Sequence, residues 1–357
     1  MQLIKRIFSF VFKIWASVSV AIFAVLVMTV VSIGLLVMIG SGVSDEDISE
    51  NKVVFGKDDA ANSLYSIPVN GVILGEKATS GWLEMLSESS VVYGYDVKKT
   101  LMDLADDDEV AGVILEINSP GGTIFGSQAI ADGVAYYKDR TGEPVIAYIS
   151  NLAASGGYWV AASADEILAD HGTTMGSIGV IFGPVSYYDG VISQDGGAFV
   201  GGVQTTGGIE TEYISAGRSK DLGNPFRRMT VDERISLQSM VDDSYGQFVT
   251  FVAAHRPLTE KEITDDIGAL VYGEIQAKEN GLIDQIANKQ GAYDYLADKA
   301  GVSNDYKVVR ESSADDVLSQ ILGMANKQTR TASLHPLCGQ QSTVLVYFGS
   351  VAVQCQP

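Results

Sequence analysis

Three short stretches of the chain carry residue types that together can hydrolyse an amide bond. Hydrolysis needs a nucleophile, a base that takes its proton, and N–H donors for the oxyanion. Ser155, in an Ala-Ala-Ser-Gly-Gly sequence, is the candidate nucleophile. A lysine can act as the base where burial lowers its pKa, because desolvation disfavours the ammonium form. Lys220, which lies among small residues before a proline turn, is the candidate base.

The candidate oxyanion donors lie in a turn that follows an apolar run. Gly121 and Gly122 come after Ser119 and Pro120, and glycines there can turn their N–H groups towards the serine. Each stretch also has a simpler interpretation. Ser155 is then only a helix N-cap, the Pro-Gly-Gly sequence only a turn, and Lys220 only a solvated surface residue. The order and the surroundings of the three stretches favour the catalytic interpretation.

Composition excludes several other kinds of site. The three histidines, His171, His255 and His335, are scattered, so they form no metal-ligand spacing and lie in no motif of a histidine-based triad. The two cysteines, Cys338 and Cys355, both lie near the C-terminus, where they could form a disulfide outside the cytoplasm. A net charge of -20 argues against a nucleic-acid partner. We expect no cofactor and no metal.

The elements that must position these residues follow an α/β pattern. Apolar runs typical of buried strands alternate with helical segments at spacings that favour a mostly parallel sheet. Ser155 falls where strand 145–149 turns into a helix. A helix over 231–254 is predicted to begin with a capping box at Thr230. The other expected strands are 64–74, 111–117, 166–168 and 178–182, and the other expected helical segments are 95–104, 124–137, 258–273 and 274–280.

The N-terminus has the pattern of a membrane anchor. Residues 1–13 include basic residues and no acidic ones. Residues 14–42 carry no charge, and this segment is long enough for a transmembrane helix. Because the basic flank precedes the span, we expect the N-terminus in the cytoplasm and the rest outside it. Cleavage as a signal peptide is the alternative. We expect a linker over 43–61, a catalytic domain over 62–300 that includes a glycine-rich loop, 191–209, and a loosely ordered extension over 301–357.

Five pieces of the sequence, taken in this order, resemble the signal peptide peptidase A family of membrane-anchored serine peptidases. The resemblance covers about 66–286. The matching pieces are INSPGG (117–122), SNLAASGGYWVAASADEILA (150–169), MGSIGVI (175–181), SAGRSKDLGNPFRRMT (215–230) and QAKENGLIDQI (276–286).

This resemblance implies a ClpP/crotonase-like fold of repeated ββα units. It implies Ser155 as nucleophile and Lys220 as general base, with oxyanion donors from Gly121, Gly122 or the amide of Gly156. It further implies degradation of remnant signal peptides in the membrane, and a homo-oligomeric ring whose serine and lysine come from different subunits. Two alternatives stay open: a related Ser/Lys peptidase that cleaves membrane-protein partners, and a non-catalytic scaffold of the same fold.

Overall fold

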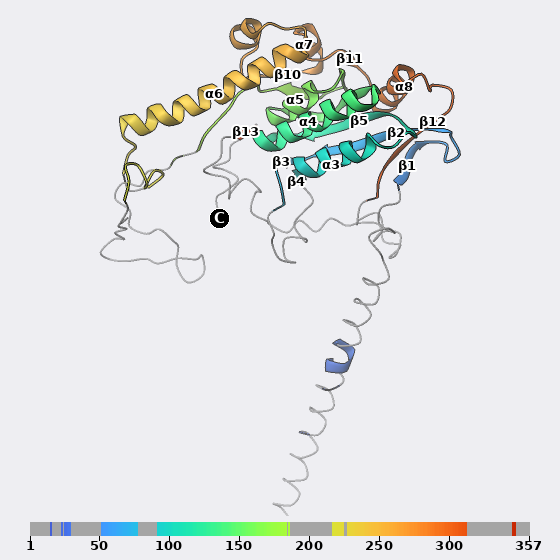
Figure 1. Ribbon diagram of the computed structural model, residues 1–357, viewed down its shortest axis with the longest axis horizontal. Coiled ribbons are helices and arrows are strands. Elements are labelled where there is room, and N and C mark those ends of the chain that lie inside the picture. The colour runs from blue at the N-terminus through green and yellow to red at the C-terminus, as the bar shows by residue number, and fades with distance from the viewer. Residues whose placement is uncertain are drawn as a thin grey trace, which may run out of the picture. The chain divides into compact units, whose positions relative to one another are not determined.

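The computed structural model describes residues 51–77, 91–183, 185, 216–224, 227–312 and 345–347, together with 15, 23 and 25–29. The chain divides into two units, and the larger comprises 53–310 and 329–357. Figure 1 shows the elements that build it. Most of the predicted anchor over 14–42, the glycine-rich loop 191–209, and Cys338 and Cys355 lie outside the described residues. In the described part of the chain, no helix is both long and apolar enough to cross a membrane.

A nine-stranded sheet forms the centre of the fold. Seven strands follow the order β1-β12-β2-β5-β7-β8-β11, while β9 pairs with the end of β7 and with β10. All neighbours from β12 to β11 pair in parallel. The sheet is therefore mostly parallel, as predicted. The bounds are β1 Asn51–Gly56, β2 Asn62–Asn70, β5 Val110–Ser119, β7 Val145–Ala154, β8 Glu166–Ala169, β9 Thr174–Gly176, β10 Val271–Gly273, β11 Gln285–Ile286 and β12 Tyr306–Glu311.

Both faces of this sheet are covered by helices. Val113 and Leu115 of β5 belong to a core shared with α3, α4 and α5, whereas Ile114 between them belongs to a core shared with α8. Successive strand residues point to opposite faces, so the continuous apolar runs of the sequence bury both faces. In Figure 1, α3, α4 and α5 lie side by side over the sheet. The helices are α3 Gly94–Leu104, α4 Ile124–Thr141, α5 Gly156–Ala162, α6 Val231–His255, α7 Glu274–Glu279 and α8 Lys289–Lys299, with a π-helical turn at Glu262–Ile267.

A second, four-stranded sheet has the order β13-β6-β3-β4. Gly71, whose φ is +89°, breaks the predicted strand 64–74 into β2 and β3, so the chain passes from the large sheet to the small one. The same change of sheet occurs between β5 and β6, immediately before α4. Strand, short strand and helix therefore recur as ββα units. The bounds are β3 Val72–Leu74, β4 Val91–Tyr93, β6 Gly121–Thr123 and β13 Leu345–Tyr347.

The sheet extends beyond the expected limits of the domain, 62–300. β1 lies within the segment predicted as a linker, and β12 lies within the predicted extension. Both strands are short, and about 250 residues separate them in the chain, so their place in the sheet could not be predicted from local patterns. The strand predicted over 178–182 is wrong. The strand there is β9, which ends at Gly176, and Ile181 makes only an isolated bridge.

Candidate functional site

Ser155 occupies a strained position between β7 and α5. Its φ and ψ are 55° and -118°, outside the regions that side-chain-bearing residues ordinarily adopt. It stands at the N-cap position of α5, yet its side chain makes no capping hydrogen bond. The simpler interpretation, in which the hydroxyl only caps the helix, is therefore wrong.

Two hydrogen bonds tie Ser155 to the end of β9 and to the loop that follows it. Its amide donates to the carbonyl oxygen of Gly176 over 2.8 Å, and its hydroxyl lies 3.4 Å from the carbonyl oxygen of Gly179 as a weak donor. The residue is 1% exposed. The second contact is long for an O–H donor, so the hydroxyl is held weakly and can turn towards another acceptor.

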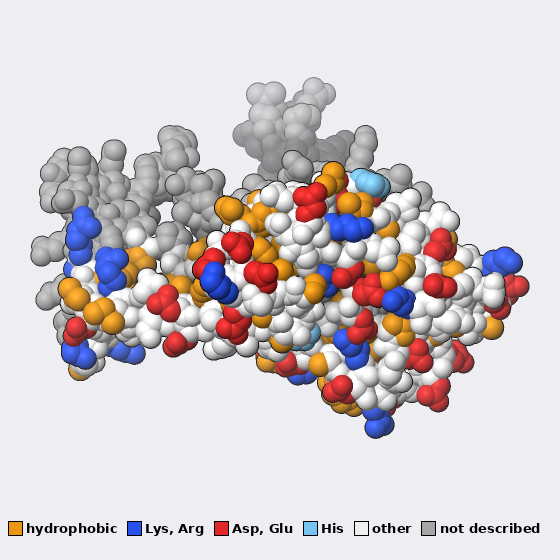
Figure 2. Space-filling view, turned by 90° about the horizontal axis from the view of Figure 1, so that it is seen from above, with side chains coloured by type: hydrophobic (Ala, Val, Ile, Leu, Met, Phe, Trp, Pro, Cys, Tyr) orange, Lys and Arg blue, Asp and Glu red, His pale blue; other side chains and the backbone are white. Residues whose placement is uncertain are grey.

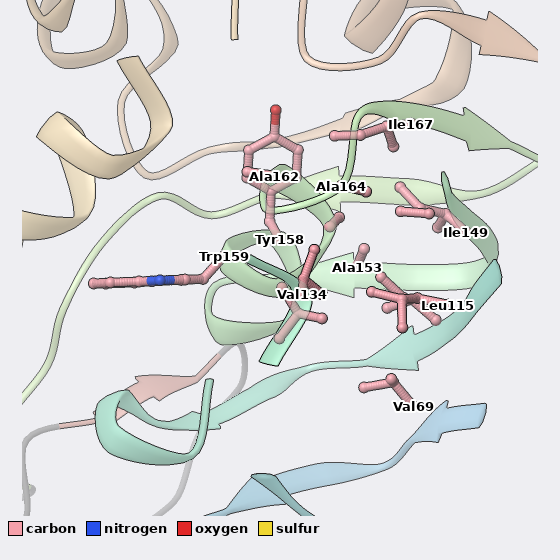
Figure 3. Packing of buried hydrophobic residues seen from close by; sticks show 14 of the residues in the cluster. Val69, Leu115, Val134, Ile149, Ala153, Tyr158, Trp159, Ala162, Ala164 and Ile167 are labelled. Carbon is pink, nitrogen blue, oxygen red and sulfur yellow. The ribbon is translucent and has the colours of Figure 1, made fainter. Parts of the chain in front are cut away.

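The helix after Ser155 is fixed to its surroundings on two sides. The hydroxyl of Tyr158 donates to the carbonyl oxygen of Leu282 over 2.8 Å. The ring of Trp159 stacks on Phe248 and Phe251 of α6, with centroid distances of 4.6 and 5.2 Å. Figure 3 shows Trp159 pointing away from Ala153 and the strands. Packing on both sides holds the N-terminal end of α5 rigidly beside β7.

The structure brings the predicted glycine turn against the Ser155 turn. A Cβ added at Gly157 would lie 2.6 Å from the carbonyl oxygen of Ser119, so the two turns touch. Gly122 is packed even more tightly, because a Cβ there would lie 1.9 Å from the carbonyl oxygen of Ile73. Only glycine fits either position.

The three predicted oxyanion donors differ in their hydrogen bonding. The N–H of Gly121 donates to Ser119 Oγ over 3.1 Å, and that hydroxyl donates to the carbonyl oxygen of Gly71 over 2.6 Å. Gly121 therefore serves the turn itself. The N–H of Gly156 has no acceptor within its own helix, because it belongs to the first turn of α5. Gly122 lies within β6 and pairs with β3 and β13, so among the three Gly156 is the donor whose position at a helix start favours the oxyanion prediction.

Lys220 lies far from Ser155 within one chain. It is exposed, in a turn that is tied to Glu233 near the start of α6. The contact of α6 with Trp159 lies at Phe248, fifteen residues further along, which corresponds to about 22 Å of helix. No side chain from Arg234 to Gln247 is buried. The structure thus does not bring Lys220 and Ser155 together in a single copy.

A cluster of charged side chains surrounds the Lys220 turn. The guanidinium of Arg227 binds both oxygens of Asp221, over 2.8 and 2.6 Å, and both oxygens of Glu233, over 2.9 and 2.7 Å. Its hydrogen bonds lower the pKa of Asp221 to about 2 and hold the pKa of Glu233 well below its usual range. Glu233 also closes the predicted capping box with Thr230. The capping box was predicted from the sequence, whereas the role of Arg227 was not, because its two partners lie on different elements.

Within the described residues, no group of three or more His, Cys, Asp or Glu side chains could hold a metal ion. The candidate groups described above are the Ser155 hydroxyl, the glycine amides beside it, and Lys220 on a separate surface. That combination suits nucleophilic chemistry once a base reaches the serine.

Comparisons with known proteins find similarity to peptidases. Residues 138–303 match the family model described as Peptidase family S49. A candidate protease from Methanocaldococcus jannaschii is 37% identical over 204 residues, which cover 57% of this chain and 61% of that protein. A candidate signal peptide peptidase SppA from Enterococcus faecium is 32% identical over 257 residues, 69% of each chain. A solved ClpP1 mutant from Listeria monocytogenes has a TM-score of 0.37 at 14% identity and covers 63% of this chain and 93% of that chain.

Proposed function

The chain belongs to peptidase family S49, and on that premise we propose that it is a serine endopeptidase with Ser155 as nucleophile and Lys220 as general base. The observation that carries the proposal is the conformation of Ser155. A buried serine at a positive φ, whose hydroxyl does not cap its helix, stores strain that a purely structural serine does not need.

The proposed reaction proceeds in two steps. Lys220 Nζ, in its neutral form, takes the proton of Ser155 Oγ as the oxygen attacks the peptide carbonyl carbon. The oxyanion is held by the amide of Gly156, the C–N bond breaks, and Lys220 gives its proton to the leaving amine. Water then attacks the acyl-enzyme with Lys220 again as base, which releases the acid and restores Ser155.

We propose further that each site combines residues of two copies in a ClpP/crotonase-like homo-oligomer. The first half of α6 supports this. No side chain from Arg234 to Gln247 is buried, and two large apolar side chains in this half of the helix, Val231 and Ile235, are 73% and 62% exposed. These two residues lie four apart, on one face of the helix. Figure 2 shows basic and hydrophobic side chains together at the end of the molecule where α6 begins. A neighbouring copy seated on this face would receive Lys220 and cover the apolar side chains.

The proposed substrates are remnant signal peptides, extended apolar segments left in the membrane after secretion. The enterococcal relative is named for this activity, and the uncharged segment 14–42 would hold the enzyme beside such substrates as a single-pass anchor. The catalytic domain would then lie on the extracytoplasmic side of the cytoplasmic membrane. Digestion of the domain by protease added to spheroplasts is the expected result, and its survival there would refute this location.

The proposal is tested by cleavage of a leucine- and alanine-rich peptide and by labelling with a fluorophosphonate, which reacts with activated serines. Ser155→Ala should abolish both. Ser127→Ala is the matched control, because the Ser127 hydroxyl is buried without a hydrogen-bond partner and its loss removes no hydrogen bond. Full activity of Ser155→Ala would overturn the proposed function.

A further inference from the structure

The residues on either side of Lys220 are fixed, while Lys220 itself is exposed. Ser219, which precedes it, hydrogen-bonds Glu233 through its side chain and has a φ of +65°. Asp221, which follows it, accepts hydrogen bonds from Nε and Nη2 of the Arg227 guanidinium. Both neighbours therefore point inward to one cluster. The backbone on both sides of Lys220 is thereby held, and Lys220 itself is exposed.

Arg227 is the centre of that cluster. It makes two parallel hydrogen bonds to each of two carboxylates, one in the turn and one on α6. Glu233 is the more buried partner, with a side chain 2% exposed, against 22% for Asp221. Paired N–H donors on a carboxylate fix direction as well as distance. Without Arg227, two carboxylates would face each other and repel, and the turn would open.

We infer that Arg227 is a positioning residue for catalysis, which aligns the Lys220 turn on the start of α6 so that the amine meets Ser155 of a neighbouring copy. This inference rests on the proposed function, because it gives Lys220 the role of base. Arg227 touches neither substrate nor Ser155 and acts through the turn. A displacement of about 1 Å in a reacting group can lower a rate about a hundredfold.

The test compares Arg227→Lys and Arg227→Ala in the full-length protein. Lysine keeps the positive charge but loses the planar pair of donors, so it cannot bind two carboxylates in parallel. We expect kcat to fall at least about tenfold in Arg227→Lys and about a hundredfold in Arg227→Ala, with KM changed less than about threefold. Thermal midpoint and oligomer size are measured alongside. Asp221→Asn, a near-isosteric change in the same cluster, is the second variant should Arg227→Ala not fold.

Arg218→Ala is the matched control. Arg218 also joins this loop to α6, through Asp232 over 3.2 Å, but both of those side chains are largely exposed. We expect its kcat to stay within about twofold of wild type, because exposed ion pairs contribute little. An equal loss of kcat in Arg218→Ala and Arg227→Lys would mean that any disturbance of the loop suffices and would overturn the specific role of Arg227.

A double variant separates positioning from structure. If Arg227 acts through Lys220, adding Arg227→Lys to Lys220→Ala should lower kcat no further. Additive losses, or full activity of Arg227→Lys beside an inactive Lys220→Ala, would overturn the inference while the proposed function stands. Full activity of Lys220→Ala would refute the proposed function itself, and the role of Arg227 with it.

Discussion

The carbonyl oxygen of Ser119 would lie 2.6 Å from a Cβ on Gly157, which places the end of β5 in contact with the first turn of α5. This contact joins the two glycine-rich turns that the sequence analysis singled out. Backbone packs against backbone here, so a methyl group at Gly157 would fit only if one of the two turns shifted.

Gly157→Ala is therefore expected to disturb the site itself. The added methyl must push α5 away from Ser119 and shift Ser155, which should lower kcat at least about tenfold. Gly246→Ala, on α6, is the matched control, because nothing lies within 4 Å of a Cβ there. That change should raise the free energy of unfolding by about 0.5–1 kcal/mol, since alanine favours a helix over glycine. Peptide cleavage and thermal midpoints of both variants measure this, and an active Gly157→Ala would contradict it.

Single variants of either residue of the proposed dyad should be inactive. Ser155→Ala, Lys220→Ala and Lys220→Arg should each lower kcat about a thousandfold, because a catalytic unit fails when one member is lost. Arginine keeps the charge but cannot lose its proton.

Mixing then locates the two residues on separate copies. Co-assembled Ser155→Ala and Lys220→Ala chains should recover about a quarter of wild-type activity, since random mixing leaves about one site in four with both groups. The variants are denatured and refolded together, and mixed oligomers are verified by tags. No recovery in verified mixed oligomers would mean that both groups must come from the same copy and would refute the shared site. Activity of Lys220→Arg above about a tenth of wild type would place the base elsewhere, with His171 and the other lysines as the next candidates.

The exposed face at the start of α6 should control assembly. Ile235→Asp places a charge in the proposed contact between copies, so the oligomer should dissociate and activity should fall with it. Ile275→Asp is the control, because Ile275 on α7 is equally exposed, at 65% against 62%. Light scattering gives the mass of each variant. An Ile235→Asp variant of unchanged mass would show that this face is not an interface.

Glu116 should make stability depend on pH in the acid range. Burial acts to raise its pKa, but hydrogen bonds from Lys289, Tyr293 and Ser66 outweigh burial, and the pKa is lowered overall. A carboxylate with a lowered pKa stabilises the fold above its ordinary value of 4.5. That contribution is lost as the pH falls through the lowered value.

Glu116→Gln tests this dependence. Its thermal midpoint should fall less than that of the wild type as the pH drops from 5 towards 3, and at pH 7 it should be less stable by about 1–3 kcal/mol. Glu279→Gln, at the end of α7, is a control that shares no contact with this cluster. If the thermal midpoints of Glu116→Gln and the wild type changed with pH in parallel, Glu116 would not be the source of the loss of stability in acid.

Local signals predicted much of this structure. Helix α3 was expected over 95–104 and spans Gly94–Leu104, and α6 was expected over 231–254 and spans Val231–His255. Both have local markers, an apolar face in the first and a capping box in the second. The turn into α5 was also found, because strand, glycines and helix follow one another directly at Ser155.

The features that the sequence did not predict depend on contacts between segments that are distant in the chain. The use of the Gly121 amide by Ser119 depends on how the turn closes, and the placement of Lys220 depends on where α6 meets α5. Arg227 was missed because its importance comes from two carboxylates on different elements. Sequence periodicity reports which face of an element is buried, and it carries no record of such partners.

The position of β12 between β1 and β2 has a consequence for the order of events during synthesis. β1 is made early, but among the described residues its neighbour in the sheet is β12, which begins at Tyr306, 250 residues after Gly56. At roughly 5–20 residues per second, a ribosome needs about 12–50 s to supply that partner. Throughout this interval the edge of β2 is open as well. A nascent chain released before Glu311 would therefore keep an unpaired strand edge, the kind of edge through which unfinished chains aggregate.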